Sequence, residues 1–484
     1  MHKPLRFADD IEPLVQFVEE TDHARILEAT LAKLRDGESI KRLLTASALA
    51  VTRSSDLPPG HHGGPLHPLV GIHAIRHTIE RVSGEERFLP VLQHVALSNK
   101  HINHPGMGPY ILAHAEPVDA GGVDATKKAF LASLDRGLYN AADHHFLWLW
   151  DNVPHAEALD LLLTPAIAKN TIDDHYFIFP MFTWRALEWL GAEYLPILMR
   201  PAVRYVSRFP TPPAVPQIDA LMDEFQLLER PLRQRTGADE TAVIGSLGEA
   251  IGRTDNYAEI PGMLARALAD GLSLDGTGEA LSIGAASLFM RSLTGNPMDV
   301  HLHTGVNLRR YLLALEGVSL KNRLRALLLW HTGPEVRSTQ NRMEPAPQPD
   351  PDAVAALPHR SQADLLDAIV ESIHTQPPTD WSKVTNLGLM RAVPEVKGTI
   401  NLAQQYGELG YDADTLIRRL AEIACHDNFT ETHALKHHQA TFEEFHATRA
   451  PWRWRHLVSA AQASAISYGK NMEVYEEAIE LLHV

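Results

Sequence analysis

Histidine is the residue type whose number and spacing in this chain most clearly suggest chemistry. The 484 residues include 27 histidines and a single cysteine, Cys425. Imidazole is the commonest side-chain ligand of metal ions, and two histidines four positions apart on a helix present their rings on one face. Such pairs occur at His73 with His77 and at His433 with His437. The spacing therefore predicts imidazole ligands for a metal ion.

The histidines recur within four degenerate copies of one helical unit. Each copy reads as two apolar helices, a variable polar loop, a helix led by a histidine and a last helix. The leading positions are His67, His175, His303 and His433. In the third copy Asp299 precedes His303 by one helical turn and replaces the second imidazole with a carboxylate. If the four helices surround a common axis, the leading side chains converge on one interior point or on two, one in each half.

These patterns together predict a transition-metal site. The predicted ligands are His67, His73, His77, His175, Asp299, His303, His433 and His437. Iron is the first choice, because non-haem iron accepts several imidazoles together with carboxylates and leaves a position open for oxygen or substrate. Manganese, copper or zinc would use the same types of residue.

The elements that must position these side chains are helices. Apolar residues recur at spacings of three and four through most of the chain, and strand-like alternation is scarce. Proline-rich segments at 209–216 and 345–358 interrupt this pattern as linkers. The sequence predicts an all-α protein of four degenerate repeat units, of about four helices each, in two tandem halves at 1–210 and 217–484. The alternative is that any helical protein yields internal alignments of this kind.

Two carboxylates accompany the predicted ligands. Asp174 lies in the run DDHYFIFPMFTW, whose aromatic residues are typical of an apolar small-molecule pocket. Glu444 lies on the helix led by His433, where a carboxylate can orient an imidazole or act as a base. We predict both as catalytic residues. The competing interpretation is that the aromatic run is a core where two helices cross and that the acidic helix face is solvated.

Composition limits the partners. The 44 Lys and Arg against 60 Asp and Glu give a formal charge of −16, which repels phosphate backbones and anionic membranes, so no nucleic acid or membrane partner is expected. One cysteine excludes an intramolecular disulfide framework and CxxC metal motifs. Neither a signal peptide nor a membrane span is recognisable, which predicts a cytoplasmic protein. The partner expected from the aromatic run is a small-molecule substrate. The oligomeric state is left open.

The third copy resembles known oxidoreductase-like proteins. Its run HTGVNLRRYLLAL, which begins at His303, resembles the H-x-x-T-x-x-x-x-L-R type segments of bacterial questin-oxidase-like proteins. The copy as a whole, with LARALADG and then GEALSIGAA, resembles the helical domain fused to Rieske-type ferredoxins. In this chain Thr304 follows the histidine directly, and no Rieske CxH pair exists. The resemblance covers about a third of the chain and implies a helical oxidoreductase-like family.

Three functions follow as expectations. The first is a non-haem, histidine-ligated metal-dependent oxidoreductase or oxygenase that acts on an apolar or aromatic small molecule. The second is a metal-free oxidoreductase or isomerase of the questin-oxidase type, in which histidines serve as acid and base groups. The third is a helical-repeat interaction protein without catalysis, whose concave face binds a partner.

Overall fold

The computed structural model describes residues 4–55, 66–103, 108, 111–212, 216–292, 297–375, 395–426, 431–468 and 473–483. Within these ranges the chain is helical, and the extended pairing is limited to an isolated bridge between Pro4 and Ala113. The predicted all-α class is therefore confirmed. Across the same residues, none of the helices combines the length and the apolar character needed to cross a bilayer.

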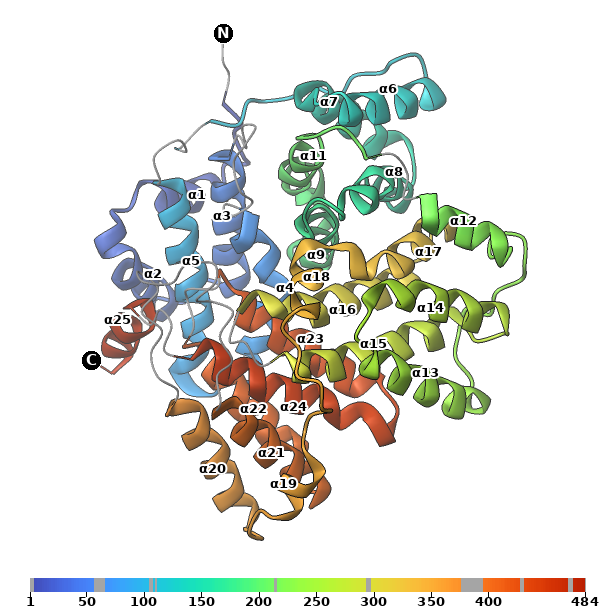
Figure 1. Ribbon diagram of the computed structural model, residues 1–484. Helices are drawn as coiled ribbons and strands as arrows, with labels where there is room; N and C mark the ends of the chain where they lie inside the picture. Colours follow the sequence, from blue (N-terminus) through green and yellow to red (C-terminus); the bar gives the residue numbers. More distant parts are fainter. Residues whose placement is uncertain are drawn as a thin grey trace. The chain divides into compact units, whose positions relative to one another are not determined.

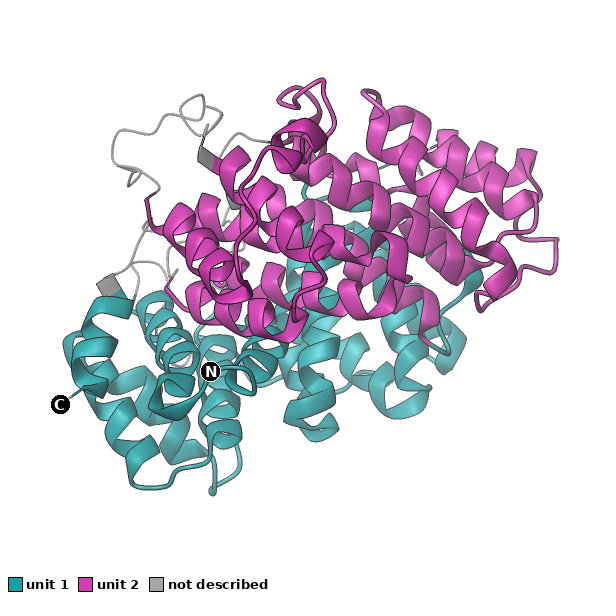
Figure 2. Ribbon diagram, turned by 90° about the horizontal axis from the view of Figure 1, so that it is seen from below, with its two compact units in different colours: residues 1–214, 316–322, 473–484 teal, residues 215–315, 323–472 magenta. Residues whose placement is uncertain are grey.

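The chain forms two compact units, coloured separately in Figure 2. Unit 1 comprises Met1–Ala214, Glu316–Asn322 and Glu473–Val484, and unit 2 comprises Val215–Leu315 and Arg323–Met472. The sequence division at 210–217 did not anticipate that two later segments belong with unit 1. The second proline-rich segment lies inside unit 2, where it includes a short helix, α19 (Pro351–Ala355).

Unit 1 is built from helices, which Figure 1 shows, and they bury apolar side chains against one another. Its helices are α1 (Glu12–Glu20), α2 (Ile26–Arg35), α3 (Ile40–Arg53), α4 (His67–Ile79), α5 (Leu89–Ile102), α6 (Val123–Asp135), α7 (Tyr139–Asn152), α8 (His155–Lys169), α9 (His175–Leu190), α10 (Leu195–Leu198), α11 (Arg200–Val206) and α25 (Glu473–Leu482). Helix α4 packs against α5 and α9, and α9 also packs against α8 and α11. This packing fixes the first turns of α4 and α9 beside each other.

Unit 2 is organised around α15, whose residues are almost all buried. Its helices are α12 (Pro216–Glu224), α13 (Thr241–Arg253), α14 (Ile260–Ala269), α15 (Leu274–Arg291), α16 (His301–Ala314), α18 (Pro334–Gln340), α19, α20 (Gln362–His374), α21 (Glu395–Glu408), α22 (Ala413–Ala424), α23 (His433–Ala447) and α24 (Ala450–Ser467). Helix α17 (Leu320–Leu328) contributes its first residues to unit 1 and the rest to unit 2.

Small residues allow the helices of unit 2 to approach closely. A Cβ atom on Gly284 of α15 would lie 2.4 Å from Ile251 Cγ2 of α13, and one on Gly248 of α13 would lie 2.7 Å from Ile283 Cγ2. Helix α15 in turn packs against α16 and α24, and α16 packs against α23. The tight core thus holds α16, α23 and α24, which carry most of the buried histidines of this unit, in fixed register.

Candidate metal centre

A histidine is the first residue of each of four helices, α4, α9, α16 and α23. Three of these residues are the leading histidines predicted from the sequence, His67, His175 and His433. The fourth differs, because a 3-10 turn over Pro297–Val300 precedes α16 and the helix begins at His301, two residues before His303. The order of helices within each predicted copy can be followed along the chain, whereas the four-copy repeat itself stays a prediction.

In unit 1 the first residues of α4 and α9 face each other. The Nε2 atoms of His67 and His175 lie 3.2 Å apart, and both side chains are buried, with 1% and 3% of their surfaces exposed. Their rings meet edge to face, and the ring of Phe179, one turn further along α9, packs against both. Two imidazole nitrogens are thereby brought close together beside an aromatic ring.

Asp173 orients one of these rings. Its Oδ1 atom accepts hydrogen bonds from both the backbone N–H of His175, at 2.9 Å, and the ring Nδ1 of the same residue, at 2.6 Å. Its Oδ2 atom accepts a hydrogen bond from the Tyr205 hydroxyl at 2.6 Å. Since Nδ1 carries the proton that it donates to Asp173, Nε2 is the nitrogen of His175 that faces His67. Metal-binding histidines are held in the same way by a carboxylate on their second nitrogen.

The electrostatics of this group agree with an ionised carboxylate. Burial alone would raise the pKa of Asp173, but the interaction with His175 and the hydrogen bond from Tyr205 outweigh it and hold that pKa well below its ordinary value. Burial and the neighbouring carboxylate raise the pKa of Tyr205 far above its ordinary value, so that the phenol stays protonated as a donor. Asp173 was not selected from the sequence. The selected Asp174 is also buried and lies at the N-cap position of α9.

In unit 2 the first residues of α16 and α23 form a corresponding pair. The Nε2 atoms of His301 and His433 lie 3.1 Å apart, the rings are stacked at an interplanar angle of 20°, and both residues are buried. A carboxylate oxygen of Glu335, the second residue of α18, lies within 4.8 Å of a ring nitrogen of His301. Neither His301 nor Glu335 is among the ligands predicted from the sequence.

The backbone before His433 is unusual. Glu431 and Thr432 have φ angles of 50° and 69°, in the left-handed region that residues with a Cβ seldom adopt. Two such residues in succession cost free energy, which the surrounding packing must offset. The result is that α23 begins abruptly at His433 and directs its first side chain towards His301.

Three further histidines of unit 2 form a chain. The Nε2 atom of His437 lies 3.3 Å from Nδ1 of His303, whose Nε2 lies 3.1 Å from Nδ1 of His456. The chain ends where Nε2 of His456 meets the hydroxyl of Thr448 at 3.1 Å. Because His303 uses its two nitrogens on opposite sides of the ring, the three imidazoles do not converge on one point. The arrangement suits a hydrogen-bonded chain better than a chelate.

These three imidazoles are neutral at physiological pH. Burial lowers the pKa of His303 to about 3, and it lowers the pKa values of His437 and His456 well below 6.5, with their imidazole neighbours adding to the effect. A neutral imidazole has one donor and one acceptor nitrogen. In each contact of the chain, either of the two nitrogens can therefore carry the proton and act as the donor. The chain can pass a proton when its imidazoles exchange tautomers.

The two predicted carboxylates of unit 2 are engaged by arginines. Both oxygens of Asp299 accept from the guanidinium of Arg342, at 2.5 and 3.1 Å, and Ser292 donates to one of them. Glu444 accepts from Arg310 at 2.5 Å, from Ser282 and from Asn307. Breaking such a buried ion pair lowers the stability of the fold. Both carboxylates therefore have a structural role, in addition to any chemical one.

The predicted HxxxH pairs are arranged differently from one another. On α4 the rings of His73 and His77 contact edge to face with centroids 4.9 Å apart, and His77 also lies 3.3 Å from Glu80 at the protein surface. On α23 the two histidines turn to different partners, His433 to His301 and His437 to His303. The two histidines of the HxxxH pair on α23 therefore belong to two separate groups.

The aromatic run DDHYFIFPMFTW is largely core, because its Tyr176, Phe177, Phe179 and Phe182 are buried. Phe146 and Trp150 of α7 are also buried. The ring of Phe146 packs against Phe130 of α6 on one side and against Trp150 on the other. Asp143 on the same helix accepts from Arg200 and Arg204 of α11. Trp150 also meets Trp184 of α9 edge to face, with ring centroids 6.4 Å apart. Phe179 of the same helix contacts the histidine pair.

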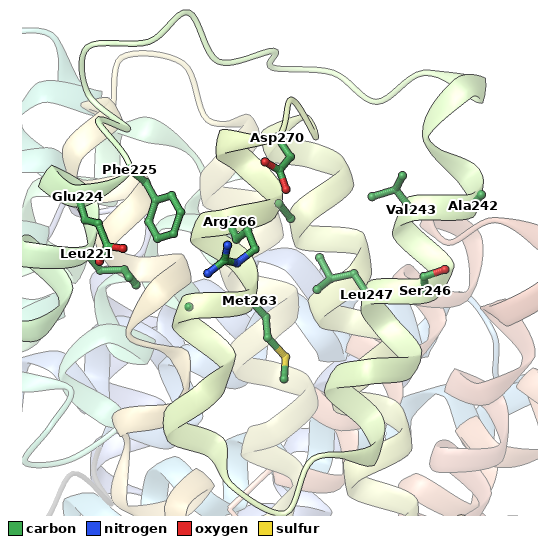
Figure 3. A pocket seen from close by; sticks show the side chains of 12 residues that line it. Leu221, Glu224, Phe225, Ala242, Val243, Ser246, Leu247, Met263, Arg266 and Asp270 are labelled. Carbon is green, nitrogen blue, oxygen red and sulfur yellow. The ribbon is translucent and has the colours of Figure 1, made fainter.

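A separate hollow of about 860 Å³ opens on unit 2 between α12, α13 and α14 (Figure 3). Its lining includes apolar side chains such as Leu221, Phe225 and Met263, together with Arg266 and Asp270. Among the described residues that line it, none is a histidine. This hollow is distinct in chemistry from the histidine groups.

The donor sets limit what the two pairs can bind. Imidazole nitrogens with a nearby carboxylate suit iron, manganese, copper or zinc, and they are poor ligands for magnesium or calcium. An ion bound to two such nitrogens keeps positions open for other ligands. Comparison with known proteins gives no match to a family model, to a curated protein or to a solved structure.

Proposed function

We propose that this chain is a metal-dependent oxidoreductase whose ion is bound by buried histidines and whose substrate is an apolar or aromatic small molecule. The observation that carries the proposal is the pair His67 and His175, whose Nε2 atoms lie 3.2 Å apart while Asp173 holds the second nitrogen of His175. A hydrogen bond between two neutral imidazoles would need only one donor and one acceptor. The carboxylate behind the ring is the additional feature that metal sites use.

The chain's own residues supply the setting for the chemistry. Asp173 and Tyr205 fix the orientation of His175, and Phe179 covers both rings and limits access of water. A bound transition ion would supply electron transfer or activation of oxygen. Iron is our first choice, with manganese, copper and zinc as the other candidates, because all four accept imidazole and carboxylate ligands.

Metal analysis of the purified protein tests this proposal. Wild type expressed in medium supplied with iron, manganese, copper and zinc is expected to carry a stoichiometric transition metal, and H67A and H175A are expected to lose most of it. His155 provides a matched control, because it is also the first residue of a helix but lies exposed and stacked on Trp150. The H155Q variant should keep the metal.

An oxidation assay separates an oxidoreductase from a zinc hydrolase. Apo protein loaded anaerobically with Fe²⁺ and then exposed to oxygen should form ferric iron faster than Fe²⁺ in buffer, followed by absorption and electron paramagnetic resonance. Protein that binds zinc alone and leaves the rate of iron oxidation unchanged would contradict the oxidative assignment.

A metal-free acid and base mechanism is the second candidate, and the histidine chain of unit 2 favours it. The bonds from His437 through His303 to His456 connect neutral imidazoles that can exchange protons. This candidate requires activity that survives thorough chelation. Loss of activity on chelation with recovery on addition of metal would exclude it.

A further inference from the structure

We propose that unit 2 contains a binding site for a small organic anion, a carboxylate or a phosphate ester with a flat apolar body. The site is a hollow of about 380 Å³, which lies within the range of small-molecule pockets, about 300–1,000 Å³. Among the described residues around it there is no histidine. The inference therefore goes beyond the proposed function and needs no metal ion.

The packing of three helices forms the hollow. Helix α15 packs against both α13 and α24, and α24 also packs against α21. The approach of α13 to α15 is close, because a Cβ atom on Gly252 would lie 2.6 Å from the Cβ of Ser287. The last turns of α13 and α15 and the first turns of α24 thereby line one hollow, together with the loop before α19.

The charged side chains of this hollow are mainly basic, although the whole chain has a formal charge of −16. Within the described ranges its lining includes three arginines and one carboxylate, which are Arg253, Arg291, Arg455 and Glu249. Arg291 is buried and already paired with Asp255 at 2.5 Å. Glu249 is shared by the other two, since it bonds Arg455 and lies 3.8 Å from Arg253. Two guanidiniums with one carboxylate between them leave one positive charge for an anionic ligand.

Hydrogen-bonding groups of the hollow remain available to a ligand. A guanidinium has five N–H donors, and the described residues engage Arg455 through Ser287 Oγ, at 2.9 Å, and through Glu249. On the opposite sign, Oε1 of Gln348 is withdrawn from solvent and has no hydrogen-bond partner within the described part of the chain. A buried acceptor without a partner costs free energy, and a hydroxyl or N–H group on the ligand would satisfy it.

Trp454 gives the hollow a rigid aromatic wall. Its indole N–H donates to the carbonyl of Ala403 at 2.9 Å, and its ring stacks on Tyr406 at an interplanar angle of 10°. Proline rings from α24 and from the loop before α19 add apolar surface. A wall of this kind suits a flat apolar body, while the arginines of the same hollow suit its acidic group.

Calorimetric titration of the full-length protein with 4-hydroxybenzoate and with phenyl phosphate tests the inference, and the neutral 4-hydroxybenzamide is titrated for comparison. We expect both anions to bind wild type, with R455Q and R253Q weakening them at least about tenfold, since each removes a charged donor. The anion that binds more tightly identifies the acidic group. Arg453, exposed on α24 and outside the hollow, gives the matched control R453Q, which should bind as wild type does.

Anions that bind R455Q and R253Q as tightly as wild type would overturn the inference, and so would a neutral amide that binds as tightly as the acids. R253Q protects this test against a loss of fold, because 72% of the Arg253 side chain is exposed. Q348L supplies a second readout, which should weaken 4-hydroxybenzoate more than benzoate because only the former carries a hydroxyl for Gln348. Failure of these titrations leaves the proposed function standing, since the metal content of H67A is measured separately.

Discussion

Two groups of histidines in unit 2 share helices α16 and α23, with α24 adding His456 to one of them, yet their nitrogens meet in different ways. His301 and His433 direct one nitrogen each at a common point, whereas His303, two residues further along α16, joins His437 and His456 through opposite sides of its ring. Side chains two positions apart on a helix point in different directions. The comparison shows that the direction of the ring nitrogens, rather than the number of histidines, separates a metal pair from a hydrogen-bonded chain.

The strongest way to break this comparison is to truncate one histidine from each group on α23. We expect H433A to lower metal affinity at least about tenfold with a small loss of stability, because it removes a proposed ligand. H437A should keep metal affinity but lower the free energy of unfolding by about 2–3 kcal/mol, because a buried polar partner of His303 is lost. Metal titration and urea unfolding of both variants measure the difference. Equal effects of H433A and H437A on metal affinity would contradict the distinction between the metal pair and the hydrogen-bonded chain.

The pH dependence of stability follows from the same chain. The folded protein keeps His303 neutral down to about pH 3 and His437 and His456 neutral well below their ordinary pKa of 6.5, while the unfolded chain binds protons there. Unfolding therefore takes up protons, and its free energy falls as pH decreases below 6.5, by about 1.4 kcal/mol per pH unit for each such imidazole.

Urea unfolding between pH 7 and pH 4 measures this slope. The H456Q variant removes one titrating ring while leaving an amide that can hydrogen bond, so its slope should be smaller than that of wild type by one proton. A wild-type slope in H456Q would mean that this ring is already protonated in the folded protein.

Asp173 distinguishes the pair of unit 1 from the pair of unit 2. D173N keeps the shape of the side chain but removes the charge that holds the proton on Nδ1 of His175. We expect metal affinity to fall about tenfold, the lower end of what such supporting residues contribute. Isothermal titration with Co²⁺ or Zn²⁺ checks this, with E371Q, at an exposed carboxylate of α20 in unit 2, as the control. An unchanged affinity would show that the carboxylate serves the fold alone.

Thr448 gives the smallest expected effect, at the end of the histidine chain. T448V preserves the shape of the side chain but leaves Nε2 of the buried His456 without the hydroxyl. We expect the free energy of unfolding to fall by about 1 kcal/mol, with metal binding unchanged. Thermal unfolding monitored by circular dichroism measures it, and a decrease in metal content would instead connect the chain to the metal site.

The sequence predicted the helical class and the start of three helices because these depend on local pattern. A polar loop followed by a histidine and an apolar period identifies the first residues of α4, α9 and α23 without tertiary information. At α16 the run HLH offered two histidines, and the 3-10 turn before the helix placed its first residue at His301 rather than His303. A similar ambiguity in the Asp173–Asp174 dipeptide concealed the carboxylate that contacts His175.

The remaining site residues depend on contacts far apart in the chain. Glu335 lies on α18 in a segment without a histidine pattern, and His456 reaches His303 across 153 positions. The engagement of Asp299 and Glu444 by Arg342 and Arg310 is likewise a tertiary feature. A local pattern cannot indicate which buried carboxylate meets an arginine and which meets an imidazole.

Anomalous diffraction from crystals of the metal-loaded protein tests the central claim most directly. We expect a peak at the absorption edge of the bound metal about 2.0–2.1 Å from Nε2 of His67 and of His175, and likewise beside His301 and His433. Density at the His73 and His77 pair, or no anomalous peak beside either buried pair in protein that elemental analysis shows to contain metal, would contradict it.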